Sequence, residues 1–198
     1  DPATSRLQAQ ERKYQLQSVR RKKKRSKEWD AFVARVMVNP EIVRHPPGLK
    51  ANEFSQIQYH LMEHIRAGKG LYKRSEGGNW GALIPEFGNE VAEAYRDAAT
   101  AFWRAYQPNT RSEGAAPNSI PVAVMFGLAG LEIELKSESA IARLTNAEAE
   151  AALRYALWEI NGFPHWFEPL CRLYPLAVTS VLHPEIQWEL LNSLPEQN

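Results

Sequence analysis

Apolar residues recur at intervals of three and four positions along much of this 198-residue chain. One such row consists of Phe54, Ile57, Leu61 and Ile65, and Gly68 follows it. This spacing places side chains on one face of an α-helix, and a glycine after the last apolar position ends the helix. The pattern therefore predicts a helix that begins near Phe54 and ends before Gly68.

Two further helices are predicted from equally local signals. Residues 145–160 begin with a capping box, formed by Thr145 and Glu148, and are followed by Asn161 and Gly162, which are typical of a left-handed helix end. A second apolar row predicts the other helix and consists of Val91, Ala94, Tyr95, Ala98, Phe102 and Trp103.

Two segments carry mixed signals. Residues 131–135 alternate apolar and acidic positions, as a strand does, whereas Pro121 is typical of a helix start. We predict a helix over residues 120–135, with a strand as the alternative. Farther along we predict short helices, each restarted near its first turn by one of four prolines: Pro164, Pro169, Pro175 and Pro184.

The N-terminal part differs from the rest of the chain in its lack of helix-breaking residues and in its charge. Residues 6–37 contain neither glycine nor proline, which predicts one long helix that ends at Pro40. Its last turns carry an apolar stripe, which we expect to pack: Trp29, Phe32, Val33 and Val36.

Charge divides the chain at about the same place. Residues 1–28 hold ten Lys/Arg and three Asp/Glu, a net charge of +7, whereas residues 29–198 hold fourteen and twenty, a net charge of −6. We therefore predict a long basic N-terminal helix over residues 1–38 and a helical-repeat body over residues 39–198.

These patterns together predict an all-α fold, either an irregular helical bundle or an α-solenoid of paired helices. No apolar run approaches the roughly 18 residues that a membrane-spanning helix needs, and the N-terminus lacks the apolar core of a secretion signal. The lone Cys171 has no internal disulfide partner, which fits a reducing compartment. We expect a cytoplasmic protein without a membrane partner.

A run of basic residues is the first candidate binding site, and it consists of Arg20, Arg21, Lys22, Lys23, Lys24, Arg25 and Lys27. Such a run neutralises phosphates and releases counterions, so it binds nucleic acid without regard to sequence and in a salt-dependent way. The same charges also suit an acidic surface on a protein partner. We keep both interpretations, and nucleic-acid binding is the alternative function.

The string from His60 to His64 matches the pattern H-x-x-E-H and lies on a predicted helix. Two histidines four positions apart share a helix face and can bind zinc, with Glu63 as base and a distant carboxylate, Glu138, as third ligand. This five-residue string resembles the inverzincin metalloproteases. We favour the simpler interpretation, in which both histidines lie on the flank of a helix and the chain is not a zinc hydrolase.

Other catalytic patterns are absent from the sequence. No segment has the G-x-x-x-x-G-K-[ST] spacing of a phosphate-binding loop. Glu132 and Glu134 lie only two positions apart, and on a helix the side chains of such a pair point in different directions and do not meet at a shared substrate. We therefore expect no catalytic residues and no cofactor in this chain.

Aromatic residues supply the second candidate binding site. The chain has six Trp, most of which we expect in the core. Four aromatic residues near the C-terminus are predicted to contact a protein partner instead: Phe163, Trp166, Phe167 and Trp188.

Several short segments resemble parts of large bacterial proteins that join a NACHT or related STAND-type NTPase to a long helical, HEAT-like region and are associated with antiphage defence. These segments are NW at 79–80, FGNEVA at 87–92, AFWR at 101–104, EINGFPHW at 159–166 and YP at 174–175. The resemblance covers about residues 29–192 and implies a sensor or scaffold region. It carries over no catalytic residue, and no NTPase motif lies in this chain.

The leading hypothesis is a non-enzymatic helical-repeat scaffold or sensor module of a larger bacterial protein, related to defence. It would bind protein partners or other domains of the same polypeptide.

Overall fold

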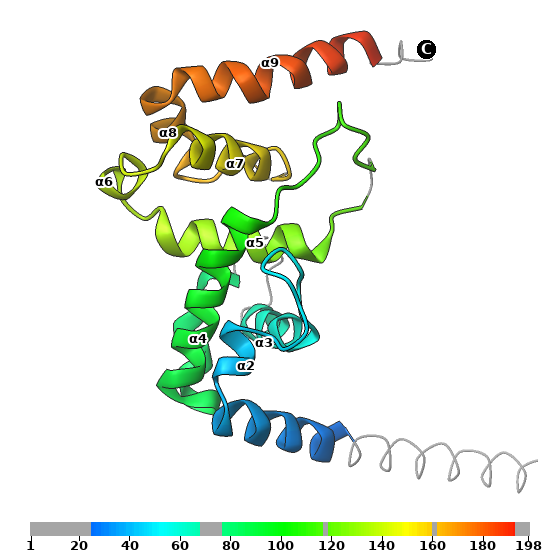
Figure 1. The fold of residues 1–198 in the computed structure, drawn as a ribbon, viewed down its shortest axis with the longest axis vertical. Coiled ribbons are helices and arrows are strands. Elements are labelled where there is room, and N and C mark those ends of the chain that lie inside the picture. Colours follow the sequence, from blue (N-terminus) through cyan, green and yellow to red (C-terminus); the bar gives the residue numbers. More distant parts are fainter. Residues whose placement is uncertain (1–24, 68–76, 117–118, 160–161, 193–198) are drawn as a thin grey trace, which may run out of the picture. The chain divides into compact units, whose positions relative to one another are not determined.

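The computed structural model describes residues 25–67, 77–116, 119–159 and 162–192. Every regular element in these ranges is a helix, and no strand occurs in them, so the predicted all-α fold is confirmed (Figure 1). The chain divides into two compact units, residues 1–39 and residues 40–198. We describe each unit by itself.

In the first unit a helix covers residues 25–38. Trp29 and Phe32 lie one turn apart on it, with ring centroids 5.3 Å from each other, and the Arg35 guanidinium lies 5.9 Å from the Phe32 ring. The helix ends before Pro40, as the pattern predicts. The earlier part of the predicted long helix lies outside the described residues.

The second unit consists of helices joined by loops (Figure 1). In chain order they are α2 (Glu41–Arg44), α3 (Gln56–Ala67), the 3₁₀ helix η2 (Trp80–Leu83), α4 (Ile84–Ala105), α5 (Val122–Glu134), α6 (Glu138–Ile141), α7 (Asn146–Ala156), α8 (Phe167–Leu173) and α9 (Pro175–Asn192).

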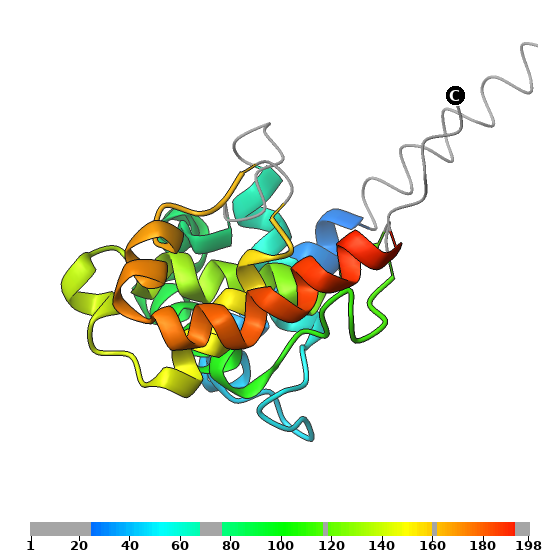
Figure 2. The same cartoon turned by 90° about the horizontal axis from the view of Figure 1, so that it is seen from above.

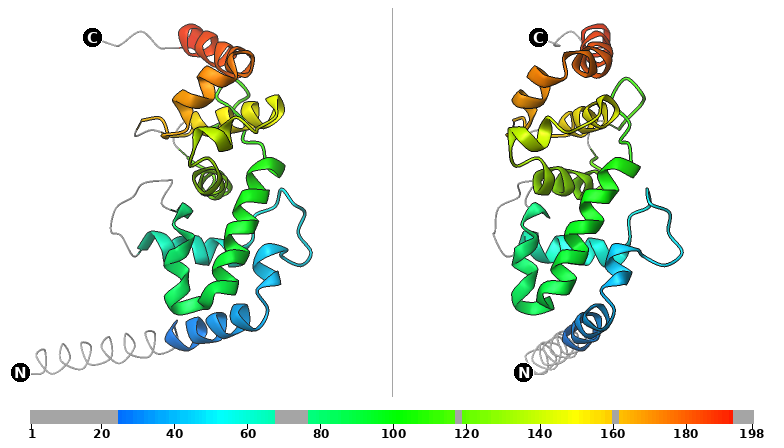
Figure 3. Two further views of the ribbon diagram at one scale, coloured as in Figure 1. Left: turned by 90° about the vertical axis from the view of Figure 1, so that its left-hand side faces the viewer. Right: turned by 60° about the vertical axis from the view of Figure 1, so that its left-hand side comes forward.

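These helices are arranged in successive layers around α5. On one side α5 packs against α3 and α4, and on the other side it packs against α7, which in turn packs against α9. Figure 3 shows α5 between α4 and α7, and Figure 2 shows α9 crossing over the layer beneath it. Segment 120–135 is therefore a helix in the middle of the unit, and not a strand.

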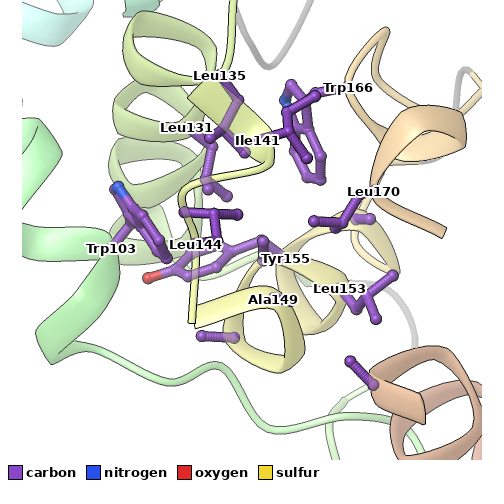
Figure 4. Packing of buried hydrophobic residues seen from close by; sticks show 14 of the residues in the cluster. Trp103, Leu131, Leu135, Ile141, Leu144, Ala149, Leu153, Tyr155, Trp166 and Leu170 are labelled. Atoms are coloured by element: carbon purple, nitrogen blue, oxygen red, sulfur yellow. The ribbon is translucent and has the colours of Figure 1, made fainter. Parts of the chain in front are cut away.

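The core between α5, α6 and α7 contains the largest buried side chains of the unit. Trp103, Tyr155 and Trp166 are fully buried there, together with leucines such as Leu131 and Leu144 (Figure 4). Full burial of such aromatic rings is among the largest apolar contributions that single residues make to a fold.

Glycine allows two very close helix contacts along α5. A Cβ atom on Gly130 would lie 2.1 Å from the carbonyl oxygen of Ala99 in α4, and one on Gly127 would lie 2.2 Å from the ring of Tyr155 in α7. The side chains at both positions are limited to a hydrogen atom, because the opposing backbone and ring occupy the space.

Arg104, at the end of α4, joins three helices. It donates hydrogen bonds of 2.5–2.6 Å to Glu134 in α5 and one of 2.6 Å to Glu148 in α7, and its guanidinium lies 4.2 Å from the Trp103 ring. The hydrogen bonds that Arg104 donates to Glu134, followed by the one that it donates to Glu148, raise the pKa of Arg104. Glu148 also forms the predicted capping box with Thr145, so one carboxylate caps α7 and binds α4.

The prediction of a proline restart at residue 184 is wrong. Pro175 begins α9 as predicted, but Pro184 lies inside this single 18-residue helix. Proline removes the hydrogen bond to the carbonyl of Ser180, four residues earlier. Both residues lie on the exposed side, where water can bind that carbonyl, so the helix continues through the proline.

Candidate protein-binding surface and loop

Helix α9 has apolar residues on two opposite faces. The inner face, which packs against α7, buries Ala177, Val181 and Glu185 at intervals of four. The outer face carries a row at intervals of three and four, which we call the outer row: Leu176, Thr179, His183, Ile186 and Leu190.

The outer row is open to solvent. Leu176 is 78% exposed, Ile186 57% and Leu190 74%, and the neighbouring Leu191 is 84% exposed. Alternation of three and four positions is the spacing at which one helix packs along another. A helix that is apolar on both faces is typical of the interior of a helical stack. Within the described residues no helix combines the length and the apolar character needed to cross a membrane.

A second feature is the connection between α4 and α5, where the part at 106–116 is held by residues of α7 and α9. The carboxylate of Glu185, on the buried face of α9, accepts hydrogen bonds from the backbone N–H groups of Arg111 (3.0 Å) and Ser112 (3.2 Å) and from the Ser112 hydroxyl. Hydrogen bonds of this kind satisfy a carboxylate that would be costly to bury alone.

Helix α7 supplies two more attachments to this loop. Arg154 donates two hydrogen bonds to the Glu113 carboxylate, at 2.6 and 2.7 Å, and a longer one of 3.3 Å to the carbonyl of Pro108. The Tyr155 hydroxyl donates to the carbonyl of Tyr106 at 2.7 Å. The loop is therefore attached to α7 and α9 at Tyr106, at Pro108 and over residues 111–113.

The electrostatics of the Glu113 contact give it a pH dependence. The Arg154 hydrogen bonds, followed by the backbone N–H of Thr110, lower the pKa of Glu113 from 4.5 to about 2. A carboxyl group with a lowered pKa in the folded state stabilises that state above its unfolded pKa, and the stabilisation is lost as the pH falls toward the folded value.

We therefore expect this loop to loosen between pH 4.5 and about 2. Because Glu113 is largely exposed, the effect on the free energy of unfolding should stay below about 1 kcal/mol. The measurement is amide exchange of Thr110 as a function of pH, corrected for intrinsic exchange. Glu113→Gln should remove the pH-dependent change at this amide, and a variant with the same profile as the parent would contradict the assignment.

A cavity of about 460 Å³ is bounded by this loop together with Ser119, Pro121 and Trp158. Its walls include the rings of Tyr106 and Trp158, the amide side chains of Gln107 and Asn109, and Ser119. No charged side chain is among the described residues that line it. The volume is within the usual range of ligand sites.

The residues predicted for zinc do not form a metal site. His64 Nε2 lies 3.1 Å from Glu86 in α4, Glu63 pairs with Arg66 at 2.6 Å, and Glu138 pairs with Arg172 at 2.8 Å. Among the described residues no group of three or more His, Cys, Asp and Glu side chains is placed to hold a metal ion. The structure does not bring Glu138 together with His60 and His64 as ligands.

The basic run is described only at its end. Arg25 and Lys27 are exposed on the helix over 25–38. Arg20, Arg21, Lys22, Lys23 and Lys24 lie outside the described residues, so binding of nucleic acid or an acidic partner stays a prediction.

The four aromatic residues predicted to contact a partner differ in burial. Phe163 is 60% exposed, and its ring stacks on that of Phe167 at 3.9 Å. Trp188 is half-buried on α9, but Trp166 is fully buried in the core. Trp166 is therefore not available to a partner in the folded chain, because its ring is covered by the helices around it.

The sequence of this chain matches no family model, and no curated protein or solved structure shows significant similarity to it.

Proposed function

We propose that this chain is a non-enzymatic helical scaffold module that binds an amphipathic helix of a partner protein along the outer row of α9. The observation that carries this proposal is the exposure of the three apolar residues of the outer row, Leu176, Ile186 and Leu190, opposite the face that packs on α7. Burial of apolar surface is the main favourable contribution to such association.

The layered arrangement supports a helix as the bound element. Helices pack along one another through rows at intervals of three and four, and the outer row of α9 carries the exposed apolar residues Leu176, Ile186 and Leu190. Helix α9 already packs on α7 through residues spaced by four. A partner helix would continue this packing by one layer.

Charge further defines the partner. Helix α9 contains two acidic residues, Glu185 and Glu189, and no Lys or Arg. Glu185 is buried, whereas Glu189 is exposed. We therefore expect a partner helix with an apolar stripe flanked by Lys or Arg, because charges beside such a seam determine which helices pair.

Site-specific photocrosslinking tests the proposal. A benzophenone amino acid at position 190 should crosslink to a helix of one partner protein, at positions spaced by three and four, and Ile186→Lys should abolish that product. The same probe at exposed Arg143, between α6 and α7, is the matched control and should not give it.

Two outcomes would contradict the proposal. Crosslinks that join only two copies of this chain would assign the outer row to self-association. Equal crosslinking from positions 190 and 143 would indicate nonspecific contact.

We further propose that this module acts within a larger bacterial NTPase of the NACHT or STAND type that functions in antiphage defence. The support is the sequence resemblance over the segments around Trp80, Phe102 and Trp166, together with an all-helical fold. The test is the gene: a Walker-type NTPase encoded in the same reading frame is expected, and a reading frame without one would contradict this context.

A further inference from the structure

The attachments of the loop at 106–116 indicate that its shape matters. Backbone groups of a surface loop can bond to water at little cost, yet here a buried carboxylate, Glu185, binds two of its N–H groups. Arg154 and Tyr155 fix two further points. Long connections with ordered shapes and no helix or strand of their own are usually functional. Residues of this loop make up most of the described lining of the cavity.

The cavity walls combine flat rings with hydrogen-bonding side chains. Tyr106 and Trp158 offer aromatic surface, and Gln107, Asn109 and Ser119 carry amide and hydroxyl donors. The lack of charged side chains in the described lining disfavours an ionic ligand, whose desolvation would not be compensated.

These features match the chemistry of a proline-rich segment. Such a segment adopts the extended polyproline II conformation, makes no internal hydrogen bonds and leaves its carbonyl groups free to accept. Aromatic-lined grooves bind it through ring contacts and a few donors, and the entropy cost is low because the conformation is already formed.

We propose that the cavity bounded by the loop at 106–116 binds an uncharged, proline-rich peptide segment. This site is separate from the outer row of α9, and the inference does not depend on the proposed partner helix.

Titration of the ¹⁵N-labelled chain with blocked decaproline tests the inference. Shifts are expected for the amides of Asn109, Ala115 and Ala116 and for the indole N–H of Trp158. A blocked decapeptide of alternating Gly and Ser is the control and should cause no such shifts. Equal shifts with both peptides, or decaproline shifts located elsewhere, would overturn the proposal.

Two variants separate loss of binding from loss of folding. Ala116→Trp should fill the cavity from an exposed position and weaken decaproline binding at least tenfold. Phe163→Ala, which removes an exposed ring that does not line the cavity, should leave it unchanged. Unchanged binding by Ala116→Trp, with a native spectrum, would refute the site.

The role of Glu185 as a positioning residue is tested with Glu185→Gln. An amide retains one accepting oxygen but loses the charge, so amide exchange of Arg111 and Ser112 should accelerate and decaproline affinity should fall. Faster exchange with unchanged affinity would show that the fixed loop is not part of a binding site.

Discussion

Replacing Gly130 with alanine should destabilise the second unit by about 3 kcal/mol, the upper end of what overpacking usually costs. The added methyl group would lie 2.1 Å from the Ala99 carbonyl oxygen and 2.6 Å from its carbonyl carbon. These are backbone atoms of α4, so no side-chain rotation relieves the contact and the two helices must separate. Urea unfolding followed by far-UV circular dichroism measures the loss.

Gly81→Ala is the matched control for this prediction. Gly81 has no atom within 4 Å of the position that a Cβ would take, so alanine there should change the free energy of unfolding little or raise it slightly. If both variants unfold at the same urea concentration, the close approach of α4 and α5 is not a real constraint.

Trp166→Ala should cost about 4 kcal/mol, because it removes a fully buried indole ring and leaves a cavity beside Ile141 and Leu170. We expect a large decrease in the unfolding midpoint and loss of near-UV dichroism from the core. The measurement is thermal or urea unfolding under identical conditions.

Phe163→Ala distinguishes this core role from the partner contact that the sequence suggests. Phe163 is only three residues away but is 60% exposed, so its loss should cost below about 1 kcal/mol. Similar stabilities for the two variants would mean that Trp166 does not lie in the core.

The predictions that the structure confirms rest on local signals. The capping box of α7 requires only Thr145 and Glu148, which lie three positions apart and bond to each other as predicted. The helices α3 and α4 follow from apolar rows that need no information from elsewhere in the chain.

The sequence pattern is ambiguous or misleading where a side chain contacts residues that are distant in the chain. The acidic positions that make 131–135 alternate bind residues far away: Glu132 lies 3.4 Å from His165, and Glu134 accepts the indole N–H of Trp103 at 3.0 Å. These positions are acidic because of these contacts, and not because they form the polar face of a strand.

The candidate sites were missed for related reasons. Because Pro184 predicts a helix break, the sequence pattern does not connect the residues of the outer row on the two sides of this proline. Glu185 is separated from Arg111 and Ser112 by 74 and 73 positions, and no local pattern indicates that a charged residue will be buried to hold a loop. Only the three-dimensional contacts reveal the loop and its cavity.

The position of α5 has a consequence for variation in this protein. Arg104 donates hydrogen bonds to Glu134 at the end of α5. The backbone of α4 leaves no space for a side chain at Gly130, and the ring of Tyr155 leaves none at Gly127. Selection of a saturated variant library for correctly folded chains should leave Gly127 and Gly130 of α5 nearly invariant while the exposed position Lys136, just after this helix, diversifies freely. Homologous chains should then share this helix as their most recognisable stretch, and changes at 127 should arise only together with a smaller residue at 155.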